Sequence, residues 1–230
     1  MKIKNRSGSH ETQREWVYHR IRLGLMAGRY QPGDRVTIAQ LTDSLGVSMT
    51  PVREALHRLA AEGALELNPN RSVLVPKLSL EEVLAIREIR EQIEGFAARR
   101  AAVNISDAQV ARLARIGSAL AAARARADAP RIMRLNENFH FTLYEAAGIR
   151  VLTDVIAVLW LRSAPSLNLL FRPENIGRYP LSKQNRHNQD LLRALSAGDG
   201  RAAARAVVAE IALGSRLLER LMQPQRYATI

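Results

Sequence analysis

The sequence of 230 residues contains no cysteine. This absence excludes disulfide frameworks, thiolate zinc sites, iron–sulfur clusters and cysteine nucleophiles. The sequence also lacks an apolar run of about 18 residues, the length that a transmembrane helix needs. Its first residues, MKIKNRSGSHETQREW, include basic side chains but not the apolar segment of a secretory signal. We therefore expect a cytoplasmic protein with no membrane partner.

Positive charge is in excess, although lysine is scarce. The chain has 34 basic and 22 acidic residues, a formal net charge of +12, and all but four of the basic residues are arginine. Such an excess indicates a polyanionic partner such as nucleic acid, whereas the arginine bias can also reflect a GC-rich genome. Residues 1–78 contribute +5 and residues 79–230 contribute +7. The charge therefore does not by itself locate a nucleic-acid site.

The apolar share of 47% is typical of a globular chain. The pattern of polar and apolar residues divides the sequence into five parts. We expect a flexible arm at 1–10, an N-terminal unit at 11–76, a linker at 77–79, an all-helical unit at 80–222 and a tail at 223–230.

The N-terminal unit begins with two helix patterns. Val17, Ile21 and Leu25 recur every four residues, as on one face of a helix. Thr37 and Gln40 have the spacing of a capping box at the start of a second, short helix.

A third helix is predicted at 50–62, after the three-residue connection Gly46-Val47-Ser48. Thr50 is the expected N-cap, and Pro51 takes the first helical position, where its missing N–H costs nothing. Apolar residues then alternate on both sides of a turn at 68–71, which predicts a two-stranded hairpin. This order of elements is that of a winged helix-turn-helix.

The short connection leaves the outer face of the third helix exposed, and a projecting helix fits the major groove of DNA. Arg53 is the leading candidate for a base or phosphate contact. Ser48 and Thr50 can bond phosphate or simply cap the helix. The full set of candidate DNA-binding residues is Ser48, Thr50, Arg53, His57, Arg58, Asn70 and Arg71.

The segment around this helix resembles the winged helix-turn-helix signature of the GntR family of bacterial transcription regulators, over residues 15–76. The residues that carry the resemblance are GVSMTPVREALHRLAAEGALE. Met49 stands where family members usually have an arginine that commonly contacts DNA, and Ala39 stands where some relatives have another. The resemblance implies DNA binding with one such contact altered.

The unit at 80–222 shows only helix signals. Six helices are predicted, at 80–102, 106–127, 130–147, 149–170, 181–197 and 200–222. Six helices in about 145 residues predict an antiparallel bundle. The fold class is therefore mainly α, with a winged helix-turn-helix followed by a six-helix bundle.

Polar residues interrupt the apolar helices of this bundle. Asn136 and His140 are four residues apart and share one helix face, so both could reach one metal ion. His187 and Glu210 lie on later helices. A buried hydrogen-bond network is the alternative interpretation.

The same helices resemble the FCD branch of the GntR family, over residues 79–220, and six helices are closer to its VanR-like subgroup. The resemblance rests on IREIREQIEGFAARRAA, LNENFHFTLYEAAG and RHNQDLLRALSAGDGRAAARAVVAEI. It implies a divalent metal, zinc or nickel, held by Asn136, His140, His187 and Glu210. Glu210 stands where the family usually has histidine, which is equally compatible with a metal-free pocket.

The resemblance also implies a small organic acid as effector and a homodimer on a palindromic operator. The candidate effector-binding residues are Arg87, Arg90, Arg134 and Trp160. Arg90 could hold a carboxylate bidentately or pair with Glu94, one turn later. The expected function is a DNA-binding transcription regulator, a repressor controlled by the effector. The alternatives are an architectural DNA binder without effector and a helical metalloenzyme.

Overall fold

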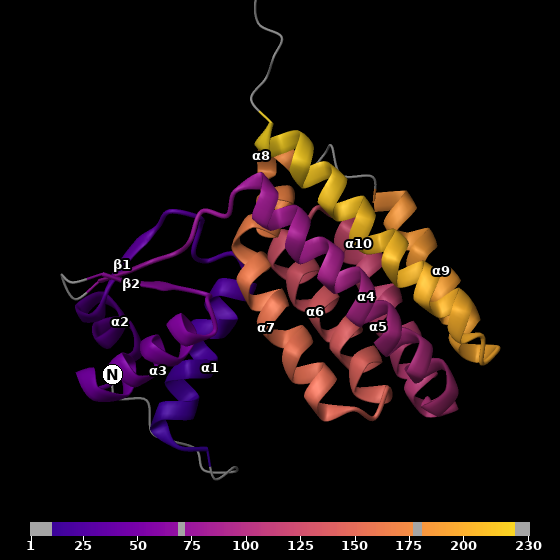
Figure 1. The fold of residues 1–230 in the computed structure, drawn as a ribbon, viewed down its shortest axis with the longest axis horizontal. Coiled ribbons are helices and arrows are strands. Elements are labelled where there is room, and N and C mark those ends of the chain that lie inside the picture. The colour runs from indigo at the N-terminus through magenta and orange to yellow at the C-terminus, as the bar shows by residue number, and fades with distance from the viewer. Residues whose placement is uncertain (1–10, 69–71, 177–180, 224–230) are drawn as a thin grey trace, which may run out of the picture.

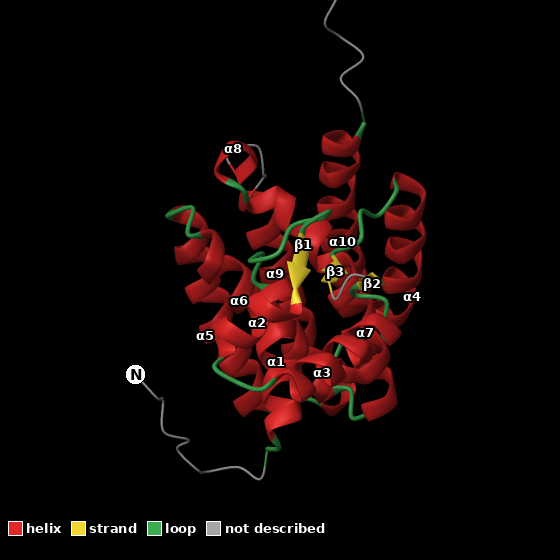
Figure 2. Ribbon diagram, turned by 90° about the vertical axis from the view of Figure 1, so that its left-hand side faces the viewer, coloured by secondary structure: helices red, strands yellow, loops and turns green. Residues whose placement is uncertain are grey.

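The structure, a computed structural model, describes residues 11–68, 72–176 and 181–223. Its N-terminal unit contains three helices and three short strands. They are α1 (Gln13–Met26), β1 (Arg35–Thr37), α2 (Ile38–Leu45), α3 (Met49–Ala61), β2 (Glu66–Asn68) and β3 (Ser72–Leu74). The strands form one antiparallel sheet in the order β1-β3-β2, drawn in yellow in Figure 2. The expected hairpin therefore gains a third strand, β1, which at three residues is too short to show an alternating pattern.

Local hydrogen bonds define α2 and α3. The hydroxyl of Thr37 accepts from the backbone N–H of Gln40, and the Gln40 side chain accepts from the backbone N–H of Thr37, which completes the predicted capping box. Gly46, with φ of +66°, ends α2 in the left-handed conformation that glycine adopts without strain. The N-cap predicted for α3 was wrong: the N-cap is Ser48, two residues before Thr50, and Thr50 lies inside the first turn.

The rest of the chain is a helical bundle, and the six predicted helices are present. They are α4 (Leu80–Asn104), α5 (Asp107–Ala125), α6 (Ala129–Ala146), α7 (Arg150–Leu167), α9 (Leu181–Ser196) and α10 (Gly200–Met222). A 3-10 turn, η1 (Asn168–Phe171), and a short helix, α8 (Pro173–Ile176), follow α7. Figure 1 shows α4 and α10 crossing one face of the bundle, and α7 on the side that meets α1.

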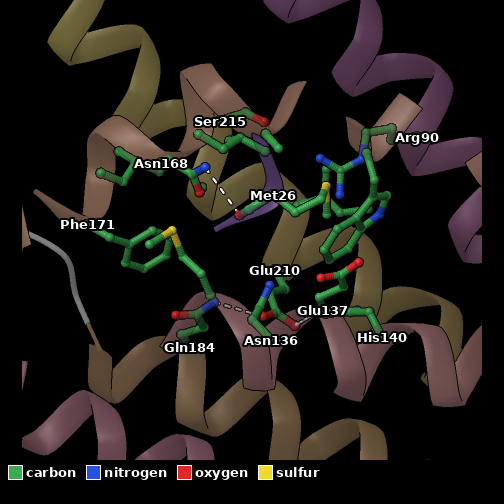
Figure 3. Close-up of a pocket in the computed structure, with 17 residues that line it drawn as sticks. Met26, Arg90, Asn136, Glu137, His140, Asn168, Phe171, Gln184, Glu210 and Ser215 are labelled. Atoms are coloured by element: carbon green, nitrogen blue, oxygen red, sulfur yellow. Dashed lines mark hydrogen bonds and ion pairs between the residues drawn. The ribbon is translucent and has the colours of Figure 1, made fainter. Parts of the chain in front are cut away.

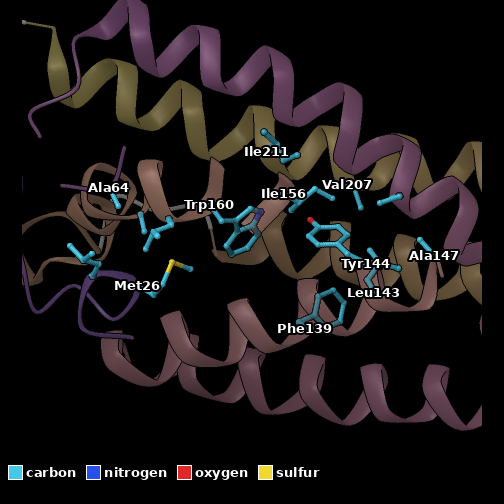
Figure 4. Packing of buried hydrophobic residues seen from close by; sticks show 14 of the residues in the cluster. Met26, Ala64, Phe139, Leu143, Tyr144, Ala147, Ile156, Trp160, Val207 and Ile211 are labelled. Atoms are coloured by element: carbon cyan, nitrogen blue, oxygen red, sulfur yellow. The ribbon is translucent and has the colours of Figure 1, made fainter. Parts of the chain in front are cut away.

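The two units share a core. Buried residues from Val17 in α1 to Ile211 in α10 belong to one connected apolar cluster. In Figure 4 this packing continues from Met26 and Ala64 through Trp160 to Phe139 and Ile211. The N-terminal unit is therefore packed against the bundle, which matters for the cavity described below.

One stretch of the described chain, Arg150–Phe171, is long and apolar enough in composition to cross a membrane, with a mean hydropathy of 1.3. It comprises α7 and η1. Its helix packs against α1, α4 and α6, and Ile156, Trp160 and Leu161 are buried. These contacts are those of a helix in the core of a folded bundle.

Candidate DNA interface and ligand cavity

The α3 helix has one buried and one exposed face. Pro51, Val52, Ala55, Leu56 and Leu59 pack inward. The exposed residues on α3 and at its start are Ser48, Met49, Thr50, Arg53, His57, Arg58 and Ala61. The five predicted contact residues of this helix therefore all reach solvent. Asn70 and Arg71 lie outside the described residues.

The exposed side chains of α3 differ in how firmly they are held. Ser48 makes no side-chain capping bond, so its hydroxyl is not used as a cap. Arg58 donates to Glu62 over 3.1 Å and covers the ring of Tyr18 at 3.8 Å, so it ties α3 to α1. Arg53 has no ion-pair partner in the described part of the chain, which leaves its guanidinium available to a phosphate or a base.

Tyr18 completes this link between the helices. Its hydroxyl donates to the Glu62 carboxylate over 2.8 Å. Burial, together with this bond to a carboxylate, raises the pKa of Tyr18 to about 12. The phenol thus stays protonated and keeps its hydrogen bond over the whole neutral range.

A cavity of about 90 Å³ lies between the bundle and the end of α1 (Figure 3). Its polar lining consists of Arg90, Asn136, Glu137, His140, Asn168, Gln184, Glu210 and Ser215. Its larger apolar lining residues are Met26, Met133, Trp160, Leu167, Leu170, Phe171 and Ile211. The cavity lining thus combines polar and apolar side chains, as expected of a site for a small amphipathic ligand.

Glu210 is the centre of one buried polar cluster beside the cavity. Its carboxylate accepts from Nε2 of Gln184 over 2.9 Å and lies 3.4 Å from Nε2 of His140. Asn188 contacts both Glu210, at 3.0 Å, and Nη1 of Arg124, at 3.3 Å, once its amide is oriented to satisfy both partners. Nη2 of the fully buried Arg124 lies 3.8 Å from Glu210. The Glu210 carboxylate is therefore surrounded by hydrogen-bond donors and by the cationic side chain of Arg124.

The charge of Glu210 is stabilised by these neighbours. Burial raises the pKa of its carboxyl, but attraction to His140 and Arg124 and hydrogen bonds from His140 and Gln184 outweigh burial and lower the pKa to about 2. Glu210 is therefore an anion at neutral pH, and Arg124 supplies a fixed positive charge close to it.

Glu94 is the centre of a second buried cluster. It is fully buried and accepts from Nε of Arg90 over 2.5 Å and from Nε1 of Trp160 over 3.0 Å. The Tyr144 hydroxyl also donates to it. Burial and the adjacent Glu94 carboxylate raise the pKa of Tyr144 well above its usual value. Arg90 is thus paired with Glu94, which is the second of the two roles expected for it.

His140 connects the two clusters. Its Nδ1 lies 3.1 Å from the Tyr144 oxygen, and the Tyr144 hydroxyl also contacts Glu94. Nε2 of His140 faces the Glu210 carboxylate, which can only accept. Both ring nitrogens of His140 thus lie beside polar partners from the chain itself.

The residues present do not fit the expected zinc or nickel site. Asn136, His140 and Glu210 line the cavity, but His187 does not. Within the described ranges no three His, Asp, Glu or Cys side chains gather as metal ligands. The buried residues that α9 turns inward are Gln184, Asn188, Leu191, Ala194 and Leu195, and one residue along a helix turns a side chain by about 100°. His187 is thus one position out of register, and the amide of Asn188 lies where its imidazole was expected.

The predicted effector residues also separate into two pairs. Arg90 and Trp160 line the cavity, with the guanidinium 4.8 Å from the indole ring centre. Arg87 is absent from the lining and is 3.6 Å from Glu91 on its own helix. Arg134 is exposed. The sequence analysis did not identify Arg124 of α5 or Gln184 and Asn188 of α9 as site residues. For α9, only the seven-residue spacing from 184 to 191 and from 188 to 195 could have indicated that this face of the helix is buried.

Comparison with known proteins agrees with this two-part structure. Residues 13–75 match the family model described as bacterial regulatory proteins, gntR family, and residues 85–212 match the FCD domain. The chain is 32% identical to the HTH-type transcriptional regulator McbR of Escherichia coli K12 over 175 residues, which cover 76% of this chain and 78% of McbR. It is 28% identical to the HTH-type transcriptional repressor RspR of the same organism, over 68% of each chain.

Solved structures show the same arrangement. The structure of E. coli McbR/YncC has a TM-score of 0.87 at 27% identity and covers 92% of this chain and 99% of its own. A putative GntR regulator from Rhodococcus sp. RHA1 shares the fold, with a TM-score of 0.71 at 19% identity over 90% of this chain and 97% of its own. The relatives are transcription regulators and not enzymes, and this chain belongs to the GntR family of DNA-binding bacterial transcription regulators, in the branch that carries an FCD domain.

Proposed function

We propose that this regulator is a cytoplasmic repressor that binds a palindromic operator as a homodimer and responds to a small organic effector in the cavity. The exposed face of α3, with Arg53 unpaired at its N-terminal end, is the observation that supports operator binding. A helix N-terminus adds backbone N–H donors and a positive dipole end, which favour phosphate. The relation to RspR, which is named a repressor, supports the sign of regulation.

Operator binding tests this proposal most directly. In a binding titration with the DNA upstream of its own gene, Arg53→Ala should weaken binding by about 1–3 kcal/mol, roughly five- to 150-fold, because a direct contact is lost. Arg115→Ala removes the same charge from an exposed position on α5 and should change the affinity less than twofold. Equal losses in the two variants would mean that net charge alone drives binding.

The chemistry of the cavity bears on the effector. The organic acid that the family resemblance implies would meet Arg90, which is already bound to Glu94, and would lie beside Glu137 and Glu210. Two buried acceptors at the cavity, Oδ1 of Asn136 and Oε1 of Gln184, have no hydrogen-bond partner among the residues that the structure describes. Because unpaired buried acceptors are costly, the lining favours a ligand that donates hydrogen bonds, such as an alcohol, an amide or an amine, over a carboxylate.

A stripe of exposed apolar residues supports the homodimer. Ile89, Phe96 and Val103 of α4 are 50%, 39% and 74% exposed, and their spacing of seven residues places them along one seam. Val151, at the start of α7, is 70% exposed and lies near the end of this stripe, because Nδ2 of Asn104 at the end of α4 donates over 3.0 Å to the carbonyl of Ala147, just before α7. Exposed apolar surface of this kind marks an interaction site, and we propose that a second copy of the chain covers it.

Disruption of this stripe should separate the dimer. Phe96→Asp places a charge in the proposed interface, and light scattering after size exclusion should then report a monomer where the unchanged chain is a dimer. Operator affinity should fall more than tenfold, because one half-site is lost. Leu23→Asp, at an exposed position on α1, is the matched control and should remain dimeric. A dimeric Phe96→Asp variant would place the interface elsewhere.

A further inference from the structure

The ligand cavity is not built by the bundle alone. Among its lining residues Met26, the last residue of α1, comes from the DNA-binding unit. It is 7% exposed, and in Figure 3 its side chain points among the lining residues of the bundle. A ligand in this cavity would therefore touch both units at once.

Asn168 attaches the same end of α1 to the bundle. Its Nδ2 lies 3.1 Å from the carbonyl oxygen of Leu25 and 3.3 Å from that of Met26, and Figure 3 shows the amide directed at this backbone. The last carbonyls of a helix have no partner within the helix, so this bond satisfies part of that need. Asn168 also lines the cavity.

Two further lining residues hold the DNA-binding unit. Nη1 of Arg22 lies 3.3 Å from Oε1 of Glu137, and both side chains are less than one-fifth exposed. Met133 lies against the turn after α1, because a Cβ built on Gly28 would be 3.3 Å from its Sδ. Glu137, Met133 and Asn168 thus face the cavity on one side and the DNA-binding unit on the other.

The small volume of the cavity adds a constraint. At about 90 Å³ it cannot take most organic effectors without expansion. The Met26 side of the wall yields most readily, since methionine side chains are adaptable.

We propose that the effector cavity is shared between the two units, and that a ligand filling it displaces Met26 and loosens α1 from α7, which lowers operator affinity. This inference rests on the proposed function for its DNA readout. Met26 couples the two: the more of the cavity a group fills, the further Met26 and the end of α1 must move.

A substitution that fills the cavity without any ligand tests this coupling. Ala164 lines the cavity from α7, and Ala164→Leu should reproduce the effect of a ligand. We expect its operator affinity to fall about fivefold or more, within the usual range of coupling between sites, and amide hydrogen exchange of residues 17–27 to become at least fivefold faster. In the double variant Met26→Ala/Ala164→Leu both quantities should return to within twofold of Met26→Ala alone.

The control is Ala114→Leu, which adds the same side chain to a separate hollow between α5 and α9 and should leave both quantities unchanged. If Ala164→Leu fails to fold, Asn168→Ala serves as the second variant. It adds no volume but removes the bond between Asn168 and the end of α1, and it should also speed hydrogen exchange in α1. An Ala164→Leu variant with unchanged exchange in α1, or one whose effect survives Met26→Ala, would overturn the inference. Absence of operator binding by the unchanged chain would instead contradict the proposed function, because the exchange measurement needs no DNA.

Discussion

Replacing Glu94 by alanine is expected to lower the free energy of unfolding by about 3–5 kcal/mol, because it leaves the buried guanidinium of Arg90 without its counter-ion. Glu94 has no exposed surface and accepts from Arg90, Trp160 and Tyr144 together. Three donors would lose their acceptor in one step. Urea titration monitored by circular dichroism measures the change.

Glu91→Ala is the matched control for this substitution. Glu91 is on the same helix and lies 3.6 Å from Arg87, but both side chains are more than one-fifth exposed. Its loss should cost less than about 1 kcal/mol, as for other solvent-exposed pairs. If Glu94→Ala cost no more than Glu91→Ala, the buried cluster around Glu94 would not stabilise the bundle.

The second large effect is expected at Arg124. Its side chain is fully buried, and it donates to Oδ1 of Asn185 over 2.8 Å and lies 3.8 Å from Glu210. Arg124→Leu should destabilise the chain by about 3–5 kcal/mol, because the anionic Glu210 then loses a buried cation. The double variant Arg124→Leu/Glu210→Leu should recover at least half of this loss, since both charges of the pair are removed and leucine fills most of the volume.

Arg126→Leu controls for the loss of one positive charge. Arg126 is two residues away and exposed, so its replacement should change stability by less than about 0.5 kcal/mol. A double variant that is less stable than Arg124→Leu alone would show that Glu210 is held by His140 and Gln184 and not by Arg124. Urea titrations of all four proteins provide the comparison.

Arg124 also gives a physical reason for the misfit of the metal site. A divalent ion bound to Glu210 would lie beside a guanidinium whose nitrogen is 3.8 Å from the same carboxylate. Two positive charges beside one carboxylate repel each other strongly in a protein interior. Glu210 therefore already has a buried cation of the chain itself, Arg124, beside it.

The sequence by itself determined the features that depend on neighbours within about four residues. The capping box at Thr37 predicted the start of α2, and the structure contains it. Boxes of the same kind at Ser79 and Ser106 begin α4 and α5. Helix patterns recurred with enough repeats to predict the six bundle helices, because each depends on one amphipathic face. The motif around α3 was sufficient for the family assignment.

The tertiary structure alone decided which side chains meet. Trp160 is 66 residues from Glu94, and Asn168 is more than 140 residues from the carbonyls that it binds. A shift of one residue distinguishes His187 from Asn188, and it turns the side chain by about 100° on the helix. Helix propensity and capping are insensitive to that rotation, whereas burial and hydrogen bonding at Glu210 depend on it. Local patterns therefore predicted the helices and the helix-turn-helix motif, and packing between distant helices decided which side chains line the cavity.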